Sequence, residues 1–405
     1  MKTSLGHLSY CTNIHAGEHW SDHFMALQQA LPGIKQQLSP NAPFGLGLRL
    51  SDVASRELEY SERLHEFKQW LTDNNLYVFT MNGFPYGGFH RVRVKDEVHT
   101  PDWTTEDRVQ YTIRLFRLLV ELLPAGMSGG VSTSPLSYRY WFKWTDRWER
   151  DRIYEATTQS LMDVVEELVR LKQGKGISMH IDIEPEPDGA LETADEFIDW
   201  FNQYLRPIGI ERLNAIFGMT VDQAEEALRE HVQLCYDVCH FAVGFERPAD
   251  VLSKLKKHKL RVGKIQISAA LKASFPPDQE GREALRQEFS RFNEPTYLHQ
   301  VVASDAAGKL SRYPDLPEAL AAFRPNHTEW RSHFHVPIFV SDFGRLQSTQ
   351  SDITEVLRLQ KEQPFTQQLE AETYTWEVLP QELKMPINDS IVRELKWVLD
   401  EMQKA

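Results

Sequence analysis

The sequence predicts an α/β protein built as a (β/α)8 barrel, and three observations carry that prediction. The chain has 405 residues, of which 41% are hydrophobic, enough for a large core. Short apolar runs alternate with amphipathic stretches of helical period, as expected of βα units around a parallel sheet. Eight such runs occur, and the first lacks the glycine-rich phosphate turn that a doubly wound open sheet would favour.

The apolar runs are the expected strands, and the amphipathic stretches are the expected helices. The strands are expected to begin near Gly6, Phe44, Leu76, Gly126, Ile177, Val232, Val262 and Ser332. The helices are expected over 20–37, 55–73, 105–123, 150–172, 190–204, 220–231, 249–257 and 351–363, with a C-terminal helix over 390–402 outside the barrel.

The connection between the seventh and eighth expected strands is unusually long. Roughly 60 residues separate them, against the ~4–6 residues of an ordinary loop. We expect residues 272–330 to form an insertion or lid, within a chain whose residues 1–405 make a single TIM-barrel domain.

Composition disfavours several classes of partner. The net charge of −13 gives little driving force for contacts with a nucleic-acid backbone. Cys11, Cys235 and Cys239 are too few for a disulfide framework, and none forms a CxxC pair. No secretory signal or membrane-spanning stretch stands out. We expect a cytoplasmic protein that binds a small molecule, with no nucleic acid and no membrane span.

Polar residues alternate with apolar ones in several expected strands. In the fifth strand, His180, Asp182 and Glu184 share one face, opposite isoleucine and methionine side chains. In this fold the chemistry sits at the carboxyl ends of the strands. The last polar residue of each run is Asn13, Asn82, Glu184, Asp237, Gln266 or His335.

Four of these strand-end residues would converge across the barrel mouth as ligands of one divalent metal. Such a nitrogen and oxygen donor set suits Mn, Zn, Fe, Co or Mg rather than a metal that prefers thiolates. The alternative is a structural network in which Lys264 neutralises Asp182 and Glu184. The expected metal ligands are Glu184, Asp237, Gln266 and His335.

Parts of the sequence resemble known families. Three stretches resemble the xylose isomerase-like TIM-barrel superfamily, which includes tagatose-type 3-epimerases and endonuclease IV: HIDIEPEPDG, YDVCHFAVGFE and KIQIS. A closer resemblance, to the EboE family of metabolite traffic proteins, lies in YCTNIHAGEHW, NGFPYGGFH, DIEPEPDG and EPTYLHQVVASDAAGKLSRYPDLPEAL. This resemblance spans nearly the whole chain and implies association with other Ebo pathway proteins.

The resemblance also implies roles for particular residues. In the epimerases the metal is held by Glu, Asp, His and Glu at strands five to eight, and the His of a D-x-x-H motif contacts substrate. By position, Glu184 and Asp237 match the first two ligands, and His240 matches the substrate contact. Gln266 stands in place of the His and His335 in place of the second Glu. An imidazole there keeps a ligand and a base, so Glu184, His240 and His335 are the expected catalytic residues.

Further residues are expected to contact the substrate. His15 follows the first strand, although it could equally belong to a helix N-terminus. Tyr86 and His90 lie in the glycine-rich stretch NGFPYGGFH, which suggests a loop close to a ligand or simply a turn. Arg139 follows the fourth strand. The full expected set is His15, Asn82, Tyr86, His90, Arg139 and Lys264.

Three functions fit these features. The first is a metal-dependent isomerase or epimerase acting on a small polyhydroxylated metabolite of a secondary-metabolite (Ebo) pathway, in which the metal polarises a carbonyl. The second is a metabolite-binding or trafficking protein without turnover, favoured by the missing Glu at strand eight. The third is an endonuclease IV-like phosphodiesterase, which the acidic balance and the small number of strand-end His and Glu candidates disfavour.

Overall fold

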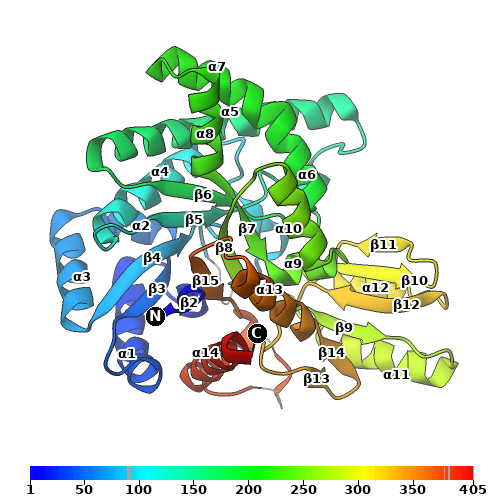
Figure 1. The fold of residues 1–405 in the computed structure, drawn as a ribbon. Coiled ribbons are helices and arrows are strands. Elements are labelled where there is room, and N and C mark those ends of the chain that lie inside the picture. The colour runs from blue at the N-terminus through cyan, green and yellow to red at the C-terminus, as the bar shows by residue number, and fades with distance from the viewer. Residues whose placement is uncertain (89–92, 378, 382–383, 405) are drawn as a thin grey trace.

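Eight parallel strands form a barrel at the centre of the computed structural model, which describes residues 1–88, 93–377, 379–381 and 384–404 (Figure 1). Each strand pairs in parallel with its neighbours, and a parallel bridge between Cys11 and Gly47 joins the first barrel strand to the second. A short antiparallel strand, β1 (Lys2–Thr3), precedes the barrel. The barrel strands are β2 (Gly6–Tyr10), β3 (Phe44–Arg49), β4 (Leu76–Asn82), β5 (Gly129–Thr133), β6 (Met179–Ile183), β7 (Val232–Asp237), β8 (Val262–Ile267) and β15 (Gln368–Ala371).

Helices surround the barrel. The expected helix over 55–73 is divided into two, and the one expected over 190–204 begins at Ala194 and continues through a π-helical turn, η4 (Phe201–Leu205), into a further helix. These helices are α1 (Trp20–Leu38), α2 (Asp52–Leu58), α3 (Ser61–Asp73), α4 (Glu106–Leu122), α5 (Arg147–Lys175), α6 (Ala194–Trp200), α7 (Arg206–Phe217), α8 (Val221–His231), α9 (Val238–Val243), α10 (Pro248–Lys257), α13 (Gln350–Glu362) and α14 (Ile387–Lys404).

The eighth barrel strand is not the one expected near Ser332, and that prediction is wrong. The strand ending at Ser332, β12 (His327–Ser332), pairs antiparallel with two strands of a second sheet. Residues 333–338 form no strand, although their alternating histidines and apolar residues imitate one. The eighth position belongs to β15, which pairs in parallel with β8 and β2.

The connection between β8 and β15 runs from 268 to 367, longer than the expected 272–330 because the eighth strand lies further along the chain. It contains a six-stranded antiparallel sheet beside the barrel, two helices of its own and the barrel helix α13 (Figure 1). The role of this segment as a lid stays a prediction. Its elements are β9 (Leu271–Ser274), α11 (Gln279–Ser290), β10 (Val301–Asp305), β11 (Leu310–Tyr313), α12 (Leu316–Ala321), β12, β13 (Asp342–Phe343) and β14 (Leu346–Ser348).

A buried ion pair fills the barrel interior. Lys264 Nζ lies 2.6 Å from Glu370 Oε2, and neither side chain is exposed. Gly47 faces this pair, and a Cβ there would lie 1.6 Å from Glu370 Oε1, so the position has room only for glycine. Lys264 therefore pairs with Glu370, and not with Asp182 and Glu184 as the structural alternative expected. Asp182 instead forms a hydrogen bond with His180 at 2.6 Å.

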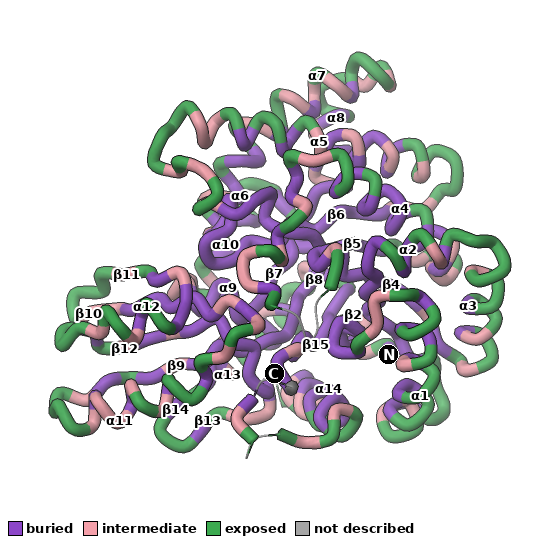
Figure 2. Tube along the Cα trace, turned by 180° about the vertical axis from the view of Figure 1, so that it is seen from behind, coloured by how far each residue is buried: buried purple, intermediate pink, exposed green. Residues whose placement is uncertain are grey.

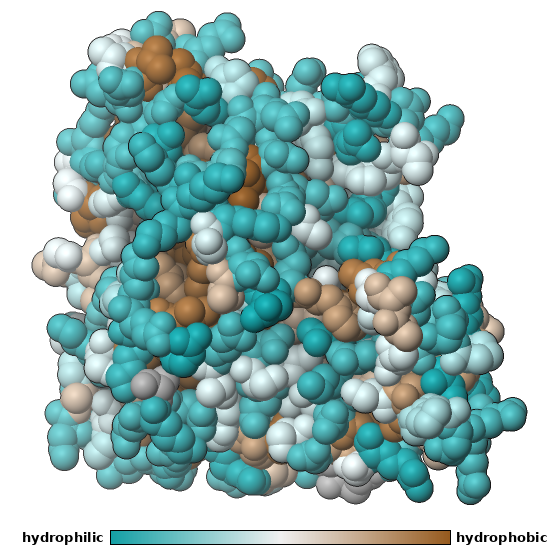
Figure 3. Space-filling model, turned by 45° about the vertical axis from the view of Figure 1, so that its right-hand side comes forward, coloured by the Kyte–Doolittle hydropathy of each residue, from teal (hydrophilic) through white to brown (hydrophobic). Residues whose placement is uncertain are grey.

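The exposed surface is mainly polar. The barrel strands are buried, whereas the helices keep exposed residues on their outer sides (Figure 2). Figure 3 shows one face covered largely by hydrophilic residues, with hydrophobic residues gathered in small separate patches. Across the described residues, no helix has the length and apolar character needed to cross a membrane.

Replacing Lys264 with Met should destabilise the protein strongly, because the buried Glu370 carboxylate would lose its partner. We expect the free energy of unfolding in urea to fall by roughly 3–5 kcal/mol. The double variant Lys264→Met/Glu370→Leu should recover much of that loss. As a matched control, Lys175→Met removes a half-exposed ion pair with Glu121 and should cost no more than about 1 kcal/mol. A single Lys264→Met variant as stable as the wild type would contradict this role.

Candidate metal centre

Three carboxylates from neighbouring strands meet at the rim of the barrel. Glu184 directly follows β6, Asp237 ends β7, and Glu372 follows β15 two residues after Glu370, on the same face. The carboxyl ends of parallel strands meet at one edge, so these side chains converge. One oxygen from each lies within 4.8 Å of the others, and all three residues are buried.

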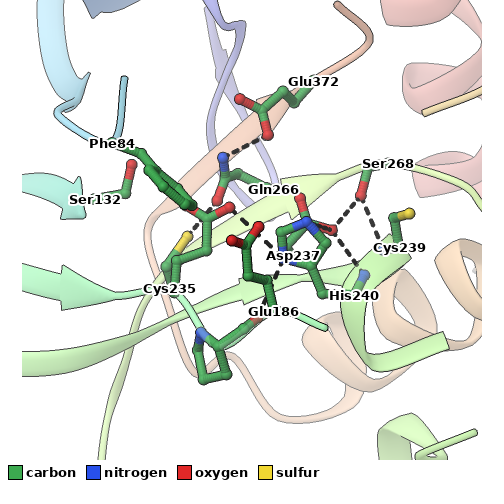
Figure 4. A network of polar contacts seen from close by, with 12 residues as sticks. Phe84, Ser132, Glu186, Cys235, Asp237, Cys239, His240, Gln266, Ser268 and Glu372 are labelled. Carbon is green, nitrogen blue, oxygen red and sulfur yellow. Dashed lines mark hydrogen bonds and ion pairs between the residues drawn. The ribbon is translucent and has the colours of Figure 1, made fainter. Parts of the chain in front are cut away.

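Amide groups hold Glu372 in place. Asn13 Nδ2 and Asn82 Nδ2 donate to its Oε1 at 2.8 and 2.9 Å, and Gln266 Nε2 donates to its Oε2 at 2.6 Å. The Gln266 carbonyl oxygen accepts a hydrogen bond from the Cys235 thiol, so Gln266 bridges Cys235 and Glu372 (Figure 4). Three N–H donors fix the orientation of this carboxylate and favour its ionised form.

Asp237 is oriented by local hydrogen bonds. Its Oδ1 accepts from the backbone N–H of His240 at 3.0 Å, as the N-cap of α9, and from the Ser268 hydroxyl at 2.8 Å (Figure 4). Its Oδ2 is buried and has no hydrogen-bond partner among the described residues, and the same holds for Glu184 Oε2. Buried polar atoms are nearly always satisfied, so these two oxygens point to a missing positive partner.

His335 reaches the same place from the inserted segment, not from the end of strand eight as expected. Its Nδ1 lies 2.9 Å from the carbonyl oxygen of Glu372. A carbonyl only accepts, so Nδ1 carries the hydrogen and Nε2 carries the lone pair. That Nε2 is buried and lacks a hydrogen-bond partner in the described chain. Burial lowers the pKa of His335 to about 4, so the ring is neutral, the form that binds metals.

The electrostatics of the cluster favour a cation. Burial, followed by the charges of Glu372 and Asp237, raises the pKa of Glu184 well above its usual value. Burial, followed by the charge of Asp237, raises the pKa of Glu372 in the same way. Three carboxylates and one neutral imidazole make an oxygen-rich donor set that fits a divalent ion, which would neutralise the charge that burial makes costly.

The cluster lines a small cavity of about 60 Å³. Its wall includes residues of the insertion and of the 3₁₀ turn η2 (Lys95–His99). The polar wall residues are Asn13, Asn82, Lys95, His99, Glu184, Glu186, His240, Tyr297, Gln300, His333, His335, Glu372 and Tyr374.

Only some of the expected substrate contacts lie at this cavity. His240 and Asn82 line it. Arg139, in η3 (Arg139–Trp141), is bound instead by Glu192 at 2.8 Å and by Glu196. It is not part of the wall that the described residues form.

The other three described residues of that set also lie away from the wall. His15 Nε2 lies 2.8 Å from the Tyr10 hydroxyl, and the Tyr86 ring packs edge-on against another tyrosine. Lys264 lies deeper, paired with Glu370. His90 lies outside the described residues.

Sequence reasoning missed Glu372, Glu186, His99 and His333. Glu372 carried a usable signal, because Gln368, Glu370 and Glu372 alternate with Leu369 and Ala371 at the period of a strand. Glu186 lies in the DIEPEPDG stretch, one strand repeat beyond Glu184. His99 lies in a connection with no periodic pattern to mark it.

The metal-free protein should lose stability as the pH rises from about 6.5 to 8. Glu184 and Glu372 have raised pKa values in the folded chain, so it holds their protons more tightly than the unfolded chain does. The stability that these two carboxyl groups contribute at a pH below their unfolded pKa is then lost as the pH rises towards their pKa in the folded chain. Buried histidines with lowered pKa values act oppositely below their unfolded pKa of about 6.5. Burial lowers the pKa of the Met1 amine to about 5, so this group also acts oppositely up to about pH 8 and is common to the wild type and the variants.

The measurement is the free energy of unfolding in urea at pH 6.5 and pH 8, with chelator present. The decrease should be smaller in Glu184→Gln/Glu372→Gln, which cannot titrate at these positions. The exposed Glu155→Gln change on α5 serves as the control and should leave the decrease unaltered. The same change in stability between pH 6.5 and pH 8 in the wild type and in Glu184→Gln/Glu372→Gln would refute this assignment.

Comparison with known proteins gives likenesses of structure alone. No protein-family model matches the chain, and no curated protein does. A xylose isomerase-like TIM barrel protein from Mycobacterium smegmatis, in complex with magnesium, aligns over 99% of this chain and 97% of its own, with 12% identity and a TM-score of 0.51. The IOLI protein with a binding zinc atom aligns over 98% of both chains at 11% identity and a TM-score of 0.49.

A D-allulose 3-epimerase from Methylomonas sp., in complex with D-allulose, aligns over 98% of this chain and 96% of its own, with 9% identity and a TM-score of 0.48. Identities this low compare folds and say nothing further about activity. The eight parallel barrel strands of this chain agree with the sequence prediction. The chain therefore has the xylose isomerase-like TIM-barrel fold.

Proposed function

We propose that the protein is a metal-dependent isomerase or epimerase acting on a small polyhydroxylated metabolite. The observation that carries this proposal is the convergence of Glu184, Asp237 and Glu372 at one buried point, with His335 in an overlapping group that shares Asp237. These four residues would hold the metal, with Gln266 orienting Glu372 instead of binding the ion. A divalent ion bound there would stabilise negative charge developing on a carbonyl oxygen of the substrate.

The two glutamates are suited to different tasks. Glu372 accepts three amide hydrogen bonds and is therefore a fixed carboxylate. Glu184 has one oxygen without a hydrogen bond, so that oxygen can take up and release a proton. We assign Glu184 as the base that moves the proton on a carbon beside the carbonyl, with His240 positioned 3.7 Å from it.

The position of Glu372 bears on the choice between turnover and simple binding. In the epimerases a second glutamate at strand eight binds the metal. If His335 replaced that glutamate, a carrier without catalysis would be favoured. Glu372 stands at the end of the eighth strand, where that pattern has its second glutamate. The resemblance to the EboE family supports a cytoplasmic role in a secondary-metabolite pathway, alongside other Ebo pathway proteins.

The test of turnover is exchange of substrate C–H for deuterium. Metal-loaded protein in deuterated water should incorporate deuterium into at least one member of a panel of ketoses and cyclitols, followed by mass spectrometry. Glu184→Gln should slow exchange by about 10²–10⁴-fold, the usual contribution of a general base. Glu155→Gln is the matched control and should keep wild-type rates. Tight retention of a ligand with unchanged mass and no exchange would instead support the carrier role.

Replacing a residue that binds the metal should weaken metal binding more than replacing a residue that only orients a ligand. Glu372→Gln is expected to lower the affinity for Mn²⁺, measured by calorimetry, by more than the ~10–100-fold typical of outer-shell changes. Gln266→Leu removes only a hydrogen bond to Glu372 and should fall within that range. Equal affinity in the wild type and Glu372→Gln would exclude Glu372 as a ligand.

A further inference from the structure

A second cluster of ligand-type side chains lies beside the first. Glu186, His240 and His333 are all buried, and one donor atom from each lies within 4.8 Å of the others. They come from the loop after β6, from α9 and from the inserted segment. His99 adds a fourth group, because its Nε2 lies 2.8 Å from Glu186 Oε1.

The contact between His99 and Glu186 is not an ordinary hydrogen bond. Although the two atoms are close, both ring nitrogens of His99 are buried and without a hydrogen-bond partner of acceptable geometry in the described chain. A nitrogen and an oxygen placed this close, but not aimed at one another, have the arrangement of two ligands that point at a third atom.

Hydrogen bonds fix the tautomer of His240. Its Nδ1 lies 3.1 Å from the carbonyl oxygen of Pro185, which can only accept. The hydrogen of a neutral ring is therefore on Nδ1, and Nε2 carries the lone pair.

The tautomer of His333 is fixed in the same way. Its Nδ1 lies 2.8 Å from Gln300 Oε1. The Gln300 amide is itself oriented, because its Nε2 donates to the carbonyl oxygen of Pro187 at 3.0 Å. Gln300 thus presents an acceptor to His333, whose hydrogen lies on Nδ1 and whose Nε2 carries the lone pair.

The two lone pairs face each other. His240 Nε2 and His333 Nε2 are 3.0 Å apart, with ring centroids 4.6 Å apart and ring planes at 81°. Two neutral imidazoles cannot form a hydrogen bond in this arrangement, and their lone pairs repel unless a cation lies between them. Two nitrogens bound to one metal at ~2.0–2.1 Å each lie roughly 3 Å apart, which matches this separation.

We propose that Glu186, His240 and His333, together with His99, bind a second divalent metal ion beside the first. The donor set of three imidazoles and one carboxylate favours zinc or cobalt, whereas the carboxylate-rich first site also suits magnesium or manganese. The sites adjoin, because His240 lies 3.7 Å from Glu184 and 3.8 Å from Asp237, and Figure 4 shows Glu186, Asp237 and His240 side by side.

This second metal goes beyond the proposed function, which needs one ion. Two adjacent ions can hold two oxygens of a substrate, as in other two-metal sites. The cavity of about 60 Å³ that both groups of residues line has room for both ions with a few waters. The centre would then select metabolites that present neighbouring oxygens, such as a hydroxyl beside a carbonyl.

Metal stoichiometry tests the proposal. Purified full-length protein is stripped with chelator, loaded with Zn²⁺ or Co²⁺, desalted and analysed for metal per chain. The wild type should hold two equivalents, and His333→Gln and Glu186→Gln should each hold one. Glu372→Gln should also lose one equivalent, from the other site. The exposed His65→Gln change on α3 is the matched control and should keep two.

The Co²⁺ spectrum gives a second measurement, in which the retained first equivalent shows that the variant is folded. Wild-type protein should show visible absorption from nitrogen-rich coordination, and this band should be lost in His333→Gln while the first equivalent stays bound. One equivalent in the wild type, or two in His333→Gln, would overturn the proposal and indicate a shared proton between the histidines. Two equivalents without deuterium exchange would uphold the second metal and refute the isomerase function, so the two failures are distinguishable.

Discussion

Negative charge buried at the barrel rim is the constraint on which the rest of the site depends. Glu184, Asp237 and Glu372 are each almost fully excluded from solvent, yet their oxygens lie within 4.8 Å of one another. Three carboxylates in such a place repel one another and have lost their hydration, so the arrangement is costly without a positive partner. The buried cation of the barrel interior, Lys264, is already paired with Glu370. A divalent ion bound at the rim would resolve both problems at once.

The barrel has two levels of buried charge, an ion pair in its interior and the candidate metal site at its rim. Below the rim, Lys264 and Glu370 form a buried ion pair in the space left by Gly47. Their charges compensate each other, so this part of the barrel resembles a structural core. At the rim, three amide donors orient Glu372 while oxygens of Glu184 and Asp237 stay without hydrogen bonds. The inserted segment contributes His333 and His335 to the cavity wall and to the groups of side chains that could bind a metal.

The sequence could predict the parts of the fold that repeat. The clean alternation in ISMHIDIE placed Glu184 at a strand end, and the D-x-x-H stretch placed Asp237 beside it. The eighth strand was harder, because β15 is a four-residue strand with a buried glutamate in its middle, a residue that strands disfavour. The HFH run near Ser332 imitated a strand more convincingly, although its backbone bonds to Gln300 and Ala269 outside any ladder.

Residues brought in by connections could not be predicted from pattern. His99 and His333 reach the cavity through a 3₁₀ turn and an insertion whose paths depend on tertiary packing. Arg139, an expected substrate contact, lies away from the cavity for the same reason, because Glu192 and Glu196 bind it there. Nothing in their local sequence distinguishes these outcomes.

Anomalous X-ray diffraction from crystals grown with Mn²⁺ or Zn²⁺ tests the central claim most directly. The account predicts an anomalous peak at about 2.0–2.3 Å from oxygens of Glu184, Asp237 and Glu372 and from His335 Nε2. Density with no peak there, and with these carboxylates protonated and hydrogen bonded to one another, would contradict it.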